Sequence, residues 1–373
     1  MKTAFLLGSL NRGGTETLLL DTFRNFQAKD VNIVCLYRMK GVLYEDFRQT
    51  SINLVRISPK SKFDVSYIFR LRKFLKNNNI EIVHAQQPLD ALYAWLACMG
   101  PKTKVLFTMH GYDFRYGKLT RKIISFVHKR TDLNIFVSKT QREYFIKKYR
   151  FRKEKTRVLY NGISFDKFDD FQYTSIRQEF DIPEDRLLLG SVGNFNPARD
   201  QLTICRFLNL LNQHNVDFTF IFAGSQSKAA PWYWEDCRNY CTEHGLQSKV
   251  IFAGLRNDIP NFLSQLDAFI YATDHDTFGI AVIEAMYMGI PVFINDWKVF
   301  EEITDGGKHA NLYQSRNEND LLEKLLLFFE NKDKYDGKAK TDAAWVKEQY
   351  SIQNHIKNLL EIYRSALAGK TIL

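Results

Sequence analysis

Short continuous runs of apolar residues alternate with segments of helical periodicity along the whole chain. Strands that are apolar on both faces are typical of parallel sheets with helices on either side. The pattern predicts seven such strands in the first half and six in the second, hence two successive sets of βα units. The predicted strands cover residues 3–9, 31–37, 53–57, 81–85, 104–109, 133–138 and 157–161, then 187–193, 218–224, 249–254, 267–272, 291–295 and 310–313.

This pattern predicts the α/β class with two doubly wound Rossmann-like domains, and 373 residues fit two domains better than one core. We expect the domains over 1–165 and 186–345. Residues 163–186 between them are polar, acidic and turn-rich, which indicates an inter-domain connection. Apolar positions at helical spacing predict an amphipathic C-terminal helix at about 349–373. Since open α/β sheets bind ligands at the carboxyl ends of their strands, the cleft between two such domains is the expected site.

Composition excludes several classes of protein. No apolar run approaches the roughly 18–20 residues that a membrane-spanning helix needs. The start, MKTAFLLGSLNRGG, lacks a small-residue cleavage site and leads into a glycine turn, so we interpret it as a buried strand rather than a signal peptide. The five cysteines are scattered and without metal-ligand spacing, which favours reduced thiols of a cytoplasmic protein and no bound metal.

Charge is distributed unevenly. The net charge is +10, but residues 1–170 carry 32 basic and 15 acidic side chains, whereas the remainder carries 20 and 27. The segment 115–157 alone has 15 basic and 3 acidic residues, with aromatic residues interleaved. Such a segment attracts anionic membranes, nucleic acids or phosphorylated substrates, or is simply a solvated surface.

The segment GSLNRGGTET (8–17) follows the first predicted strand. Gly8 and Gly13 have P-loop spacing, but Gly14 stands where that motif requires lysine, which argues against a P-loop ATPase. The paired glycines allow backbone amides to approach a ligand closely where a helix begins. A plain tight turn explains the pattern equally well.

Histidines follow two of the predicted strands. His110 and Asp113 lie just after residues 104–109, and His84 lies at the end of 81–85. A histidine at the carboxyl end of a buried strand is a candidate catalytic residue or a structural one.

The segment GSVGNFNPARDQ (190–201) opens the second domain with a strand, a glycine turn and Arg199. A guanidinium donates to two oxygens at once, which suits phosphate recognition.

Two acids, Asp276 and Glu284, interrupt the apolar stretch HDTFGIAVIEAMYMGIPVF (275–293). The pattern predicts a strand, a loop and then a helix that ends at Gly289. The backbone amides of Phe278, Gly279 and Ile280 therefore fall at a helix N-terminus, which favours an anionic phosphate. Glu284, in the first two turns, suits a pair of ribose hydroxyls. The alternative is that Asp276 caps the helix and Glu284 faces solvent.

The spacing of these two acids resembles the E-x7-E signature of retaining glycosyltransferases of the GT4 type. GGTET, MHGYD, VLYNGISFDKF, GNFNPARDQ and VIFAG are similar to further segments of that family. The resemblance implies the GT-B architecture, in which two Rossmann-like domains face each other across a nucleotide-sugar cleft. It also implies that the C-terminal helix packs back on the first domain.

Carried over by position, the resemblance implies a role for each matching residue. Glu284 would hold the ribose, and Asp276, as a catalytic residue, would hold the donor sugar. Arg199 with Asn194 and the amides of 278–280 would bind the diphosphate. Gly13, Gly14 and the catalytic His110 would contact the donor from the first domain. Asp276 replaces the family's glutamate and Asn194 its usual arginine, while Arg199 stands where lysine is usual.

The sequence thus predicts a cytoplasmic retaining glycosyltransferase that needs no metal or other cofactor. It would transfer a sugar from a nucleotide-sugar donor to a saccharide or lipid-linked acceptor in cell-surface polysaccharide or glycolipid biosynthesis. The 115–157 segment predicts peripheral contact with the inner face of an anionic membrane, and no nucleic-acid partner is expected. The alternatives are a nucleic-acid- or membrane-binding protein on the same scaffold, or a nucleotide-sugar epimerase.

Overall fold

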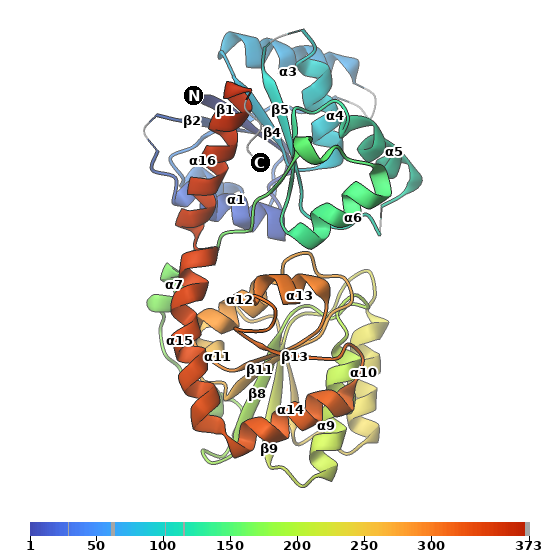
Figure 1. The fold of residues 1–373 in the computed structure, drawn as a ribbon, viewed down its shortest axis with the longest axis vertical. Helices are drawn as coiled ribbons and strands as arrows, with labels where there is room; N and C mark the ends of the chain where they lie inside the picture. Colours follow the sequence, from blue (N-terminus) through green and yellow to red (C-terminus); the bar gives the residue numbers. More distant parts are fainter. Residues whose placement is uncertain (29, 61–63, 101, 115, 370–373) are drawn as a thin grey trace. The chain divides into compact units, whose positions relative to one another are not determined.

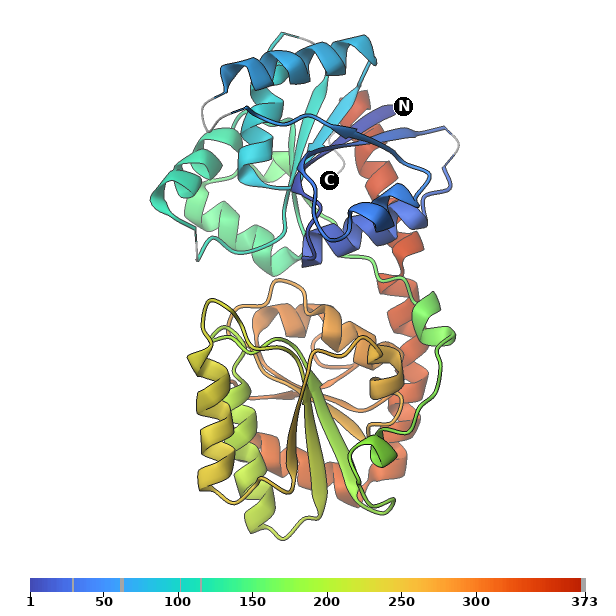
Figure 2. The ribbon, with the colours of Figure 1, turned by 180° about the vertical axis from the view of Figure 1, so that it is seen from behind.

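The structure is a computed structural model that describes residues 1–28, 30–60, 64–100, 102–114 and 116–369. It divides into two compact units. The first contains Met1–Ile163 with the described part of Ile352–Leu373, and the second is Ser164–Ser351. Each unit holds one sheet whose paired strands are all parallel, with helices over its faces (Figures 1 and 2). The predicted α/β class with two doubly wound sheets is confirmed.

The sheet of the first unit has seven strands in the order β3-β2-β1-β4-β5-β6-β7. Its order changes direction beside β1, where β2 and β4 are the two neighbours of that strand. All seven strands lie where apolar runs predict them. Their bounds are β1 (Lys2–Ser9), β2 (Asn32–Met39), β3 (Asn53–Arg56), β4 (Ile82–Ala85), β5 (Lys104–Met109), β6 (Leu133–Phe136) and β7 (Thr156–Val158).

Helices cover both faces of this sheet because its strands are apolar on both sides. One core joins the sheet to α1, α2 and α16, and two further cores join its other face to α3, α4, α5 and α6. The bounds are α1 (Gly14–Arg24), α2 (Tyr44–Arg48), α3 (Val65–Asn77), α4 (Pro88–Ala97), α5 (Lys118–Val127), α6 (Lys139–Tyr149), the 3-10 turn η1 (Lys153–Lys155) and α16 (Ile352–Ala368).

The sheet of the second unit has six strands in the order β10-β9-β8-β11-β12-β13. A core of buried residues joins it to α9, α10 and α14. The strand bounds, all at predicted positions, are β8 (Leu187–Val192), β9 (Phe218–Ala223), β10 (Val250–Gly254), β11 (Ala268–Tyr271), β12 (Val292–Asn295) and β13 (Asn311–Tyr313). The helices are α7 (Asp166–Asp169), α8 (Ile176–Glu179), α9 (Gln201–Gln213), α10 (Trp232–Glu243), α11 (Ile259–Leu263), α12 (Ile280–Tyr287), α13 (Lys298–Ile303), α14 (Glu318–Glu330) and α15 (Lys332–Tyr350).

The predicted connection, residues 163–186, is built into the second unit from Ser164 onward. The backbone amides of Thr174 and Ile176 donate to the side chains of Asn261 and Gln265 at 3.0 and 2.9 Å. These two amide side chains lie four residues apart, so they project from the same side of the chain. They accept hydrogen bonds from backbone amides of a segment that is not paired in a sheet.

The helix predicted at the C-terminus begins a new element at Ile352. The backbone at Ser351 is extended (φ −62°, ψ 150°), which separates α15 from α16. Along α16, the buried side chains of Ile352, Ile356, Leu359 and Tyr363 lie in the core of the first unit. Covering this apolar stripe explains why the helix packs on that sheet.

Candidate functional site

The candidate donor site of the second unit lies on the loops that follow β8 and β11, which are neighbouring strands. Parallel strands bring their carboxyl ends to one edge of the sheet, so both loops begin at that edge. Thr273 Oγ1 and the amide of Asp274 both donate to the carbonyl of Ala198, at 2.8 and 3.1 Å, and join the two loops.

Asp276 and Arg199 form an ion pair at the centre of this region. Arg199 Nη1 lies 2.9 Å from Asp276 Oδ2, and the hydroxyl of Tyr271 donates to the same oxygen at 2.7 Å. The guanidinium also lies over the Tyr271 ring, 4.9 Å from its centroid. Asp276 Oδ1 accepts from the amides of Thr277 and Phe278 at 2.9 and 3.5 Å. The carboxylate therefore fixes both Arg199 and the turn before α12.

The amino terminus of α12 is set by Gly279, whose φ of +81° lies in the left-handed region. A Cβ at this position would lie 2.6 Å from Phe300 Cε1, so glycine is required for two reasons. Phe278 is buried, with its ring 5.7 Å from that of Tyr350. The first amides of α12 have no partner within the helix and carry its positive dipole end, so the arrangement suits an anion.

Glu284 lies in the second turn of α12 and is mostly buried. Its side chain is 12% exposed, and Lys167 Nζ of α7 lies 3.3 Å from Oε1. Burial at this level excludes the alternative of an ordinary solvent-facing glutamate. The Lys167 side chain is 49% exposed, so it can move away without disturbing a packed core.

Asn194 joins the loops after β8 and β9. Its Oδ1 accepts from the amide and the hydroxyl of Ser225 at 3.1 and 2.9 Å. A Cβ at Gly224 would lie 2.0 Å from the carbonyl oxygen of Gly193, which shows how closely the two loops approach. The observed role of Asn194 is to hold this loop pair, and its predicted contact with the diphosphate stays a prediction.

In the first unit, Gly13 and Gly14 form the start of α1, directly after the β1 loop. Gly13 is the N-cap and Gly14 the first helical residue. A Cβ at Gly14 would have no atom within 4 Å, whereas one at Gly13 would lie 2.6 Å from Glu16 Oε2. The space beside Gly14 is open, as close approach of a ligand requires, and its role stays a prediction.

His110 follows β5 at the carboxyl edge of the first sheet. Its Nε2 lies 2.8 Å from Gln86 Oε1, and Gln86 Nε2 points to the carbonyl of His84 at 3.4 Å. That orientation makes His110 Nε2 the donor, so Nδ1 is the acceptor of the neutral ring. Burial, with the nearby His355, lowers the pKa of His110 to about 3. At neutral pH the ring can accept a hydrogen bond from a sugar hydroxyl but offers no positive charge.

Two other residues near His110 are structural. Asp113 is fully buried and accepts from Tyr144 at 2.6 Å, from Lys148 at 2.9 Å and from Tyr149. It therefore anchors α6 to the loop after β5. His84 links β4 to α16 through Tyr363, 2.7 Å away.

Sequence reasoning missed Tyr271, Lys167 and Gln86. Each is a partner of a predicted residue: Tyr271 of Asp276, Lys167 of Glu284 and Gln86 of His110. A hydroxyl at the carboxyl end of a buried strand was the available signal for Tyr271. Lys167 lies 117 residues from Glu284 along the chain, so no local pattern connects them.

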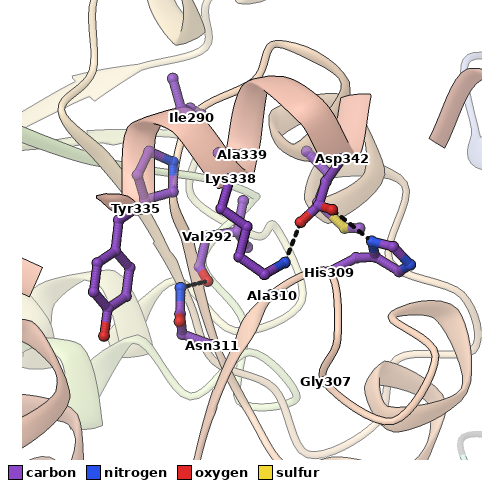
Figure 3. A pocket seen from close by; sticks show the side chains of 12 residues that line it. Ile290, Val292, Gly307, His309, Ala310, Asn311, Tyr335, Lys338, Ala339 and Asp342 are labelled. Atoms are coloured by element: carbon purple, nitrogen blue, oxygen red, sulfur yellow. Dashed lines mark hydrogen bonds and ion pairs between the residues drawn. The ribbon is translucent and has the colours of Figure 1, made fainter. Parts of the chain in front are cut away.

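A separate pocket of about 60 Å³ lies beside the amino ends of β12 and β13 (Figure 3). Asp342 of α15 lies there between Lys338 and His309. The distance from His309 Nδ1 to Asp342 Oδ1 is 2.9 Å. This is the edge of the sheet opposite the β8 and β11 loops, so the pocket is not part of the candidate donor site.

The described part of the chain contains neither a candidate membrane-spanning helix nor a cluster of candidate metal ligands. No helix there is long and apolar enough to cross a bilayer. Nor do three or more histidine, cysteine, aspartate or glutamate side chains come together in it as metal ligands.

Family models match both halves of the chain. The model of Glycosyltransferase Family 4 matches residues 12–167, and that of Glycosyl transferases group 1 matches residues 172–350. With two parallel sheets and an acid-bearing helix N-terminus at the carboxyl edge of the second, the class is that of GT-B glycosyltransferases. The chain belongs to the GT4-type family of that class.

Curated relatives are distant but cover most of the chain. The O-antigen biosynthesis glycosyltransferase WclY of Escherichia coli is 24% identical over 322 residues, 82% of this chain and 83% of the relative. The Escherichia coli UDP-Gal:alpha-D-GlcNAc-diphosphoundecaprenol alpha-1,3-galactosyltransferase is 24% identical over 287 residues, 72% of this chain and 71% of the relative.

Solved structures share the fold. Anabaena Alr3699/HepE in complex with UDP and glucose has a TM-score of 0.83 at 18% identity, covering 98% of this chain and 100% of that one. A glycosyltransferase from Rickettsia africae ESF-5 has a TM-score of 0.86 at 19% identity, covering 99% of each chain. At these identities the likeness establishes the GT-B fold alone.

Proposed function

We propose that this glycosyltransferase is a retaining enzyme that transfers a sugar from a nucleotide-sugar donor to a saccharide or lipid-linked saccharide acceptor in surface polysaccharide biosynthesis. The observation that carries the proposal is the arrangement of Arg199 and Asp276 beside the N-terminus of α12, with Glu284 mostly buried in its second turn. The donor and acceptor named for the Escherichia coli galactosyltransferase relative support the same chemistry.

The proposed chemistry follows from these groups. As the bond between the anomeric carbon and the diphosphate breaks, the acceptor hydroxyl bonds to that carbon on the same face and passes its proton to the diphosphate. Negative charge develops on the leaving diphosphate in this step. Arg199 and the amides of Gly279 and Ile280 stabilise that charge because they are already oriented by Asp276 and by the left-handed turn at Gly279. The amide of Phe278 joins them once it exchanges its 3.5 Å contact with Asp276 Oδ1 for the diphosphate. Glu284 accepts hydrogen bonds from the ribose once Lys167 moves aside. His110, neutral at pH 7, contributes a hydrogen-bond acceptor.

Product analysis tests this proposal. Purified protein is incubated with nucleotide sugars of α configuration and a synthetic GlcNAc-diphosphate lipid, and the product linkage is assigned by NMR. An α-linked disaccharide is expected. A β-linked product contradicts retention, and an altered nucleotide sugar formed without acceptor indicates an epimerase instead.

We further propose that α5 docks the first unit on an anionic membrane. Leu119 and Phe126 are exposed on this helix, 70% and 38%, next to Lys118, Arg121 and Lys122. Arg130 lies over the Phe126 ring, 3.5 Å from its centroid. Exposed apolar side chains among cations suit a surface of acyl chains and anionic headgroups.

A further inference from the structure

A pocket of about 400 Å³ lies at the amino edge of the first sheet, the edge opposite His110 and Gly14. It lies between the C-terminal ends of α3 and α4, the residues that precede β4 and β5, and the last turn of α16. Its volume is that of a small-molecule site, and none of the residues predicted to contact the donor lines it. The lining residues are Arg72, Leu75, Lys76, Asn79, Ile80, Glu81, Ala97, Cys98, Lys102, Thr103 and Leu367.

Three cations of this pocket have no acidic partner. Within the described part of the chain, no ion pair involves Arg72, Lys76 or Lys102. The single acid of the lining, Glu81, accepts a hydrogen bond from the backbone amide of Lys2 at 2.7 Å and is thereby directed toward the start of β1. The pocket therefore carries an excess of positive charge that favours an anion.

The guanidinium of Arg72 is held in place by the turn that follows α4. Its Nη1 donates to the carbonyl of Met99 at 2.6 Å, and a Cβ at Gly100 would lie 3.6 Å from its Nη2. Among the described residues, Nε and Nη2 have no acceptor. An arginine that is oriented by one backbone contact and keeps two free donors is suited to bind two oxygens of one phosphate group.

The floor of the pocket is apolar. Leu75, Ile80 and Ala97 are exposed by only 3%, 6% and 1% of their surface. A ligand that covers this floor needs an apolar portion beside its anionic group.

The outer face of α3 extends this combination of apolar and basic side chains. Val65 and Phe69 are 64% and 67% exposed. They share one face of the helix with Arg72 and Lys76, because successive positions differ by three or four residues. The surroundings of the pocket are thus suited to an amphiphile rather than to a bare ion.

We propose that this pocket binds a phosphate ester with an apolar body, in which Arg72, Lys76 and Lys102 hold the phosphate while the apolar floor covers the body. A phosphate monoester carries up to two negative charges at neutral pH, which three cations match better than they match one carboxylate. A lipid headgroup with its acyl chains and a small soluble ester both provide this chemistry. The site lies at the edge of the sheet opposite the sugar-transfer residues of the first unit, so it adds a second ligand to the protein.

Ligand-observed NMR titration with hexyl phosphate and inorganic phosphate tests the site. Hexyl phosphate should bind the wild type at least about 10-fold more tightly than inorganic phosphate, since its chain covers the apolar floor. Its affinity should fall at least about 5-fold in both Arg72→Gln and Lys102→Gln, because each loses a charge-assisted hydrogen bond. Lys102 is exposed and has no partner among the described residues, so Lys102→Gln remains informative if Arg72→Gln folds poorly.

The matched control is Lys73→Gln, which removes an exposed cation of α3 that does not line the pocket. Phosphate bound at Arg199 of the second unit would respond equally in all three variants, so a decrease confined to Arg72→Gln and Lys102→Gln locates the site. Equal affinity in these two variants and in Lys73→Gln, or equal affinity of the wild type for hexyl and inorganic phosphate, overturns the proposal.

Two further probes identify the source of the phosphate. Monomeric dihexanoylphosphatidic acid represents a lipid headgroup, and phenyl phosphate represents a soluble ester. Tighter binding of the first, weakened in Arg72→Gln and Lys102→Gln, identifies a lipid ligand, and tighter binding of the second identifies a soluble one. Binding of neither probe to the wild type contradicts the proposal.

Discussion

At the scale of single residues, Asp276 illustrates how a shorter acid is used. Its four partners, Arg199, Tyr271 and two backbone amides, hold the carboxylate close to the loop from which it comes. A glutamate would reach one methylene further. Asp276 therefore orients Arg199 in the unliganded site, and its proposed contact with the donor sugar is an additional role.

Replacing Asp276 with asparagine separates these two roles. The variant Asp276→Asn keeps the shape and releases Arg199 from its counter-charge, so nucleotide affinity should be unchanged or higher. Transfer should fall about 10- to 100-fold, because the hydrogen bond that a sugar hydroxyl donates to a charged carboxylate is lost. Calorimetry for nucleotide and steady-state rates for transfer measure the two effects separately. Glu323→Gln on α14 is the control and should change neither quantity. If Asp276→Asn lowers nucleotide affinity and transfer rate to the same extent, the role of Asp276 is limited to supporting Arg199.

At the scale of elements, two helix starts make different demands on glycine. Gly279 needs a left-handed backbone and lies against Phe300, so Gly279→Ala should destabilise the second unit by about 1–2 kcal/mol or more. Gly14 has open space and helical geometry, so Gly14→Ala should leave stability unchanged or raise it by up to about 1 kcal/mol. Urea unfolding measures both.

Activity then tests whether Gly14 serves a ligand. If the open space admits substrate, Gly14→Ala is stable but transfers sugar at least about 10-fold more slowly, since an added methyl group obstructs close approach. A stable variant with full activity would leave Gly14 as an ordinary helix start.

The packing of α16 on the first sheet makes the free energy of unfolding decrease at acidic pH. His84 and His355 are buried, the first against Tyr363 of α16 and the second on α16 itself, and burial lowers their pKa values to about 3 and about 4. Below a pH of about 6.5 these histidines bind protons in the unfolded chain but stay neutral in the folded protein. The free energy of unfolding is therefore highest above that pH and falls as the pH decreases toward 4. At pH 5 each histidine should lower the free energy of unfolding by about 2 kcal/mol relative to its value well above pH 6.5.

Urea unfolding between pH 7 and pH 5 measures the slope of the free energy of unfolding against pH. We expect His355→Gln to reduce the pH dependence, whatever it does to stability at pH 7, and the exposed His244→Gln to leave the slope unchanged. An unaltered slope in His355→Gln would show that other groups cause the acid sensitivity.

The elements were predictable from the sequence because each buried strand is a continuous apolar run between turns, and all thirteen follow such runs. The packing of residues 164–186 on the second unit could not be predicted from the sequence, because its partners Asn261 and Gln265 lie about 90 residues away along the chain. Site positions such as Arg199, Asp276 and Glu284 could be located by their place after strands, but the pairs Arg199–Asp276 and Lys167–Glu284 join residues 77 and 117 apart. Local periodicity contains no information on such pairs.

At the scale of the whole molecule, basic charge concentrates in the part of the chain that forms the first unit, while the second half is acidic. This division fits a first unit at an anionic surface and a second unit that depends on a few oriented cations rather than on net charge.

Vesicle sedimentation tests the membrane proposal. The wild type should bind vesicles of phosphatidylglycerol and phosphatidylcholine but not of phosphatidylcholine alone. Binding should weaken as salt rises from about 0.1 to about 1 M, because screening shortens from about 10 to about 3 Å. Leu119→Asp, at a position 70% exposed, should fold normally and bind less. Equal binding to neutral vesicles, or preference for an oligonucleotide, would contradict the proposal.

The central claim, a nucleotide-sugar site at the start of α12, is tested most directly by thermal stabilisation with UDP, GDP, ADP and CMP. At 100 times its dissociation constant, a bound nucleotide adds about 2.7 kcal/mol of stability. We predict that one nucleotide stabilises the wild type and the control Glu323→Gln but not Glu284→Gln. Stabilisation by none of the four, or an equal response in Glu284→Gln, would contradict the claim.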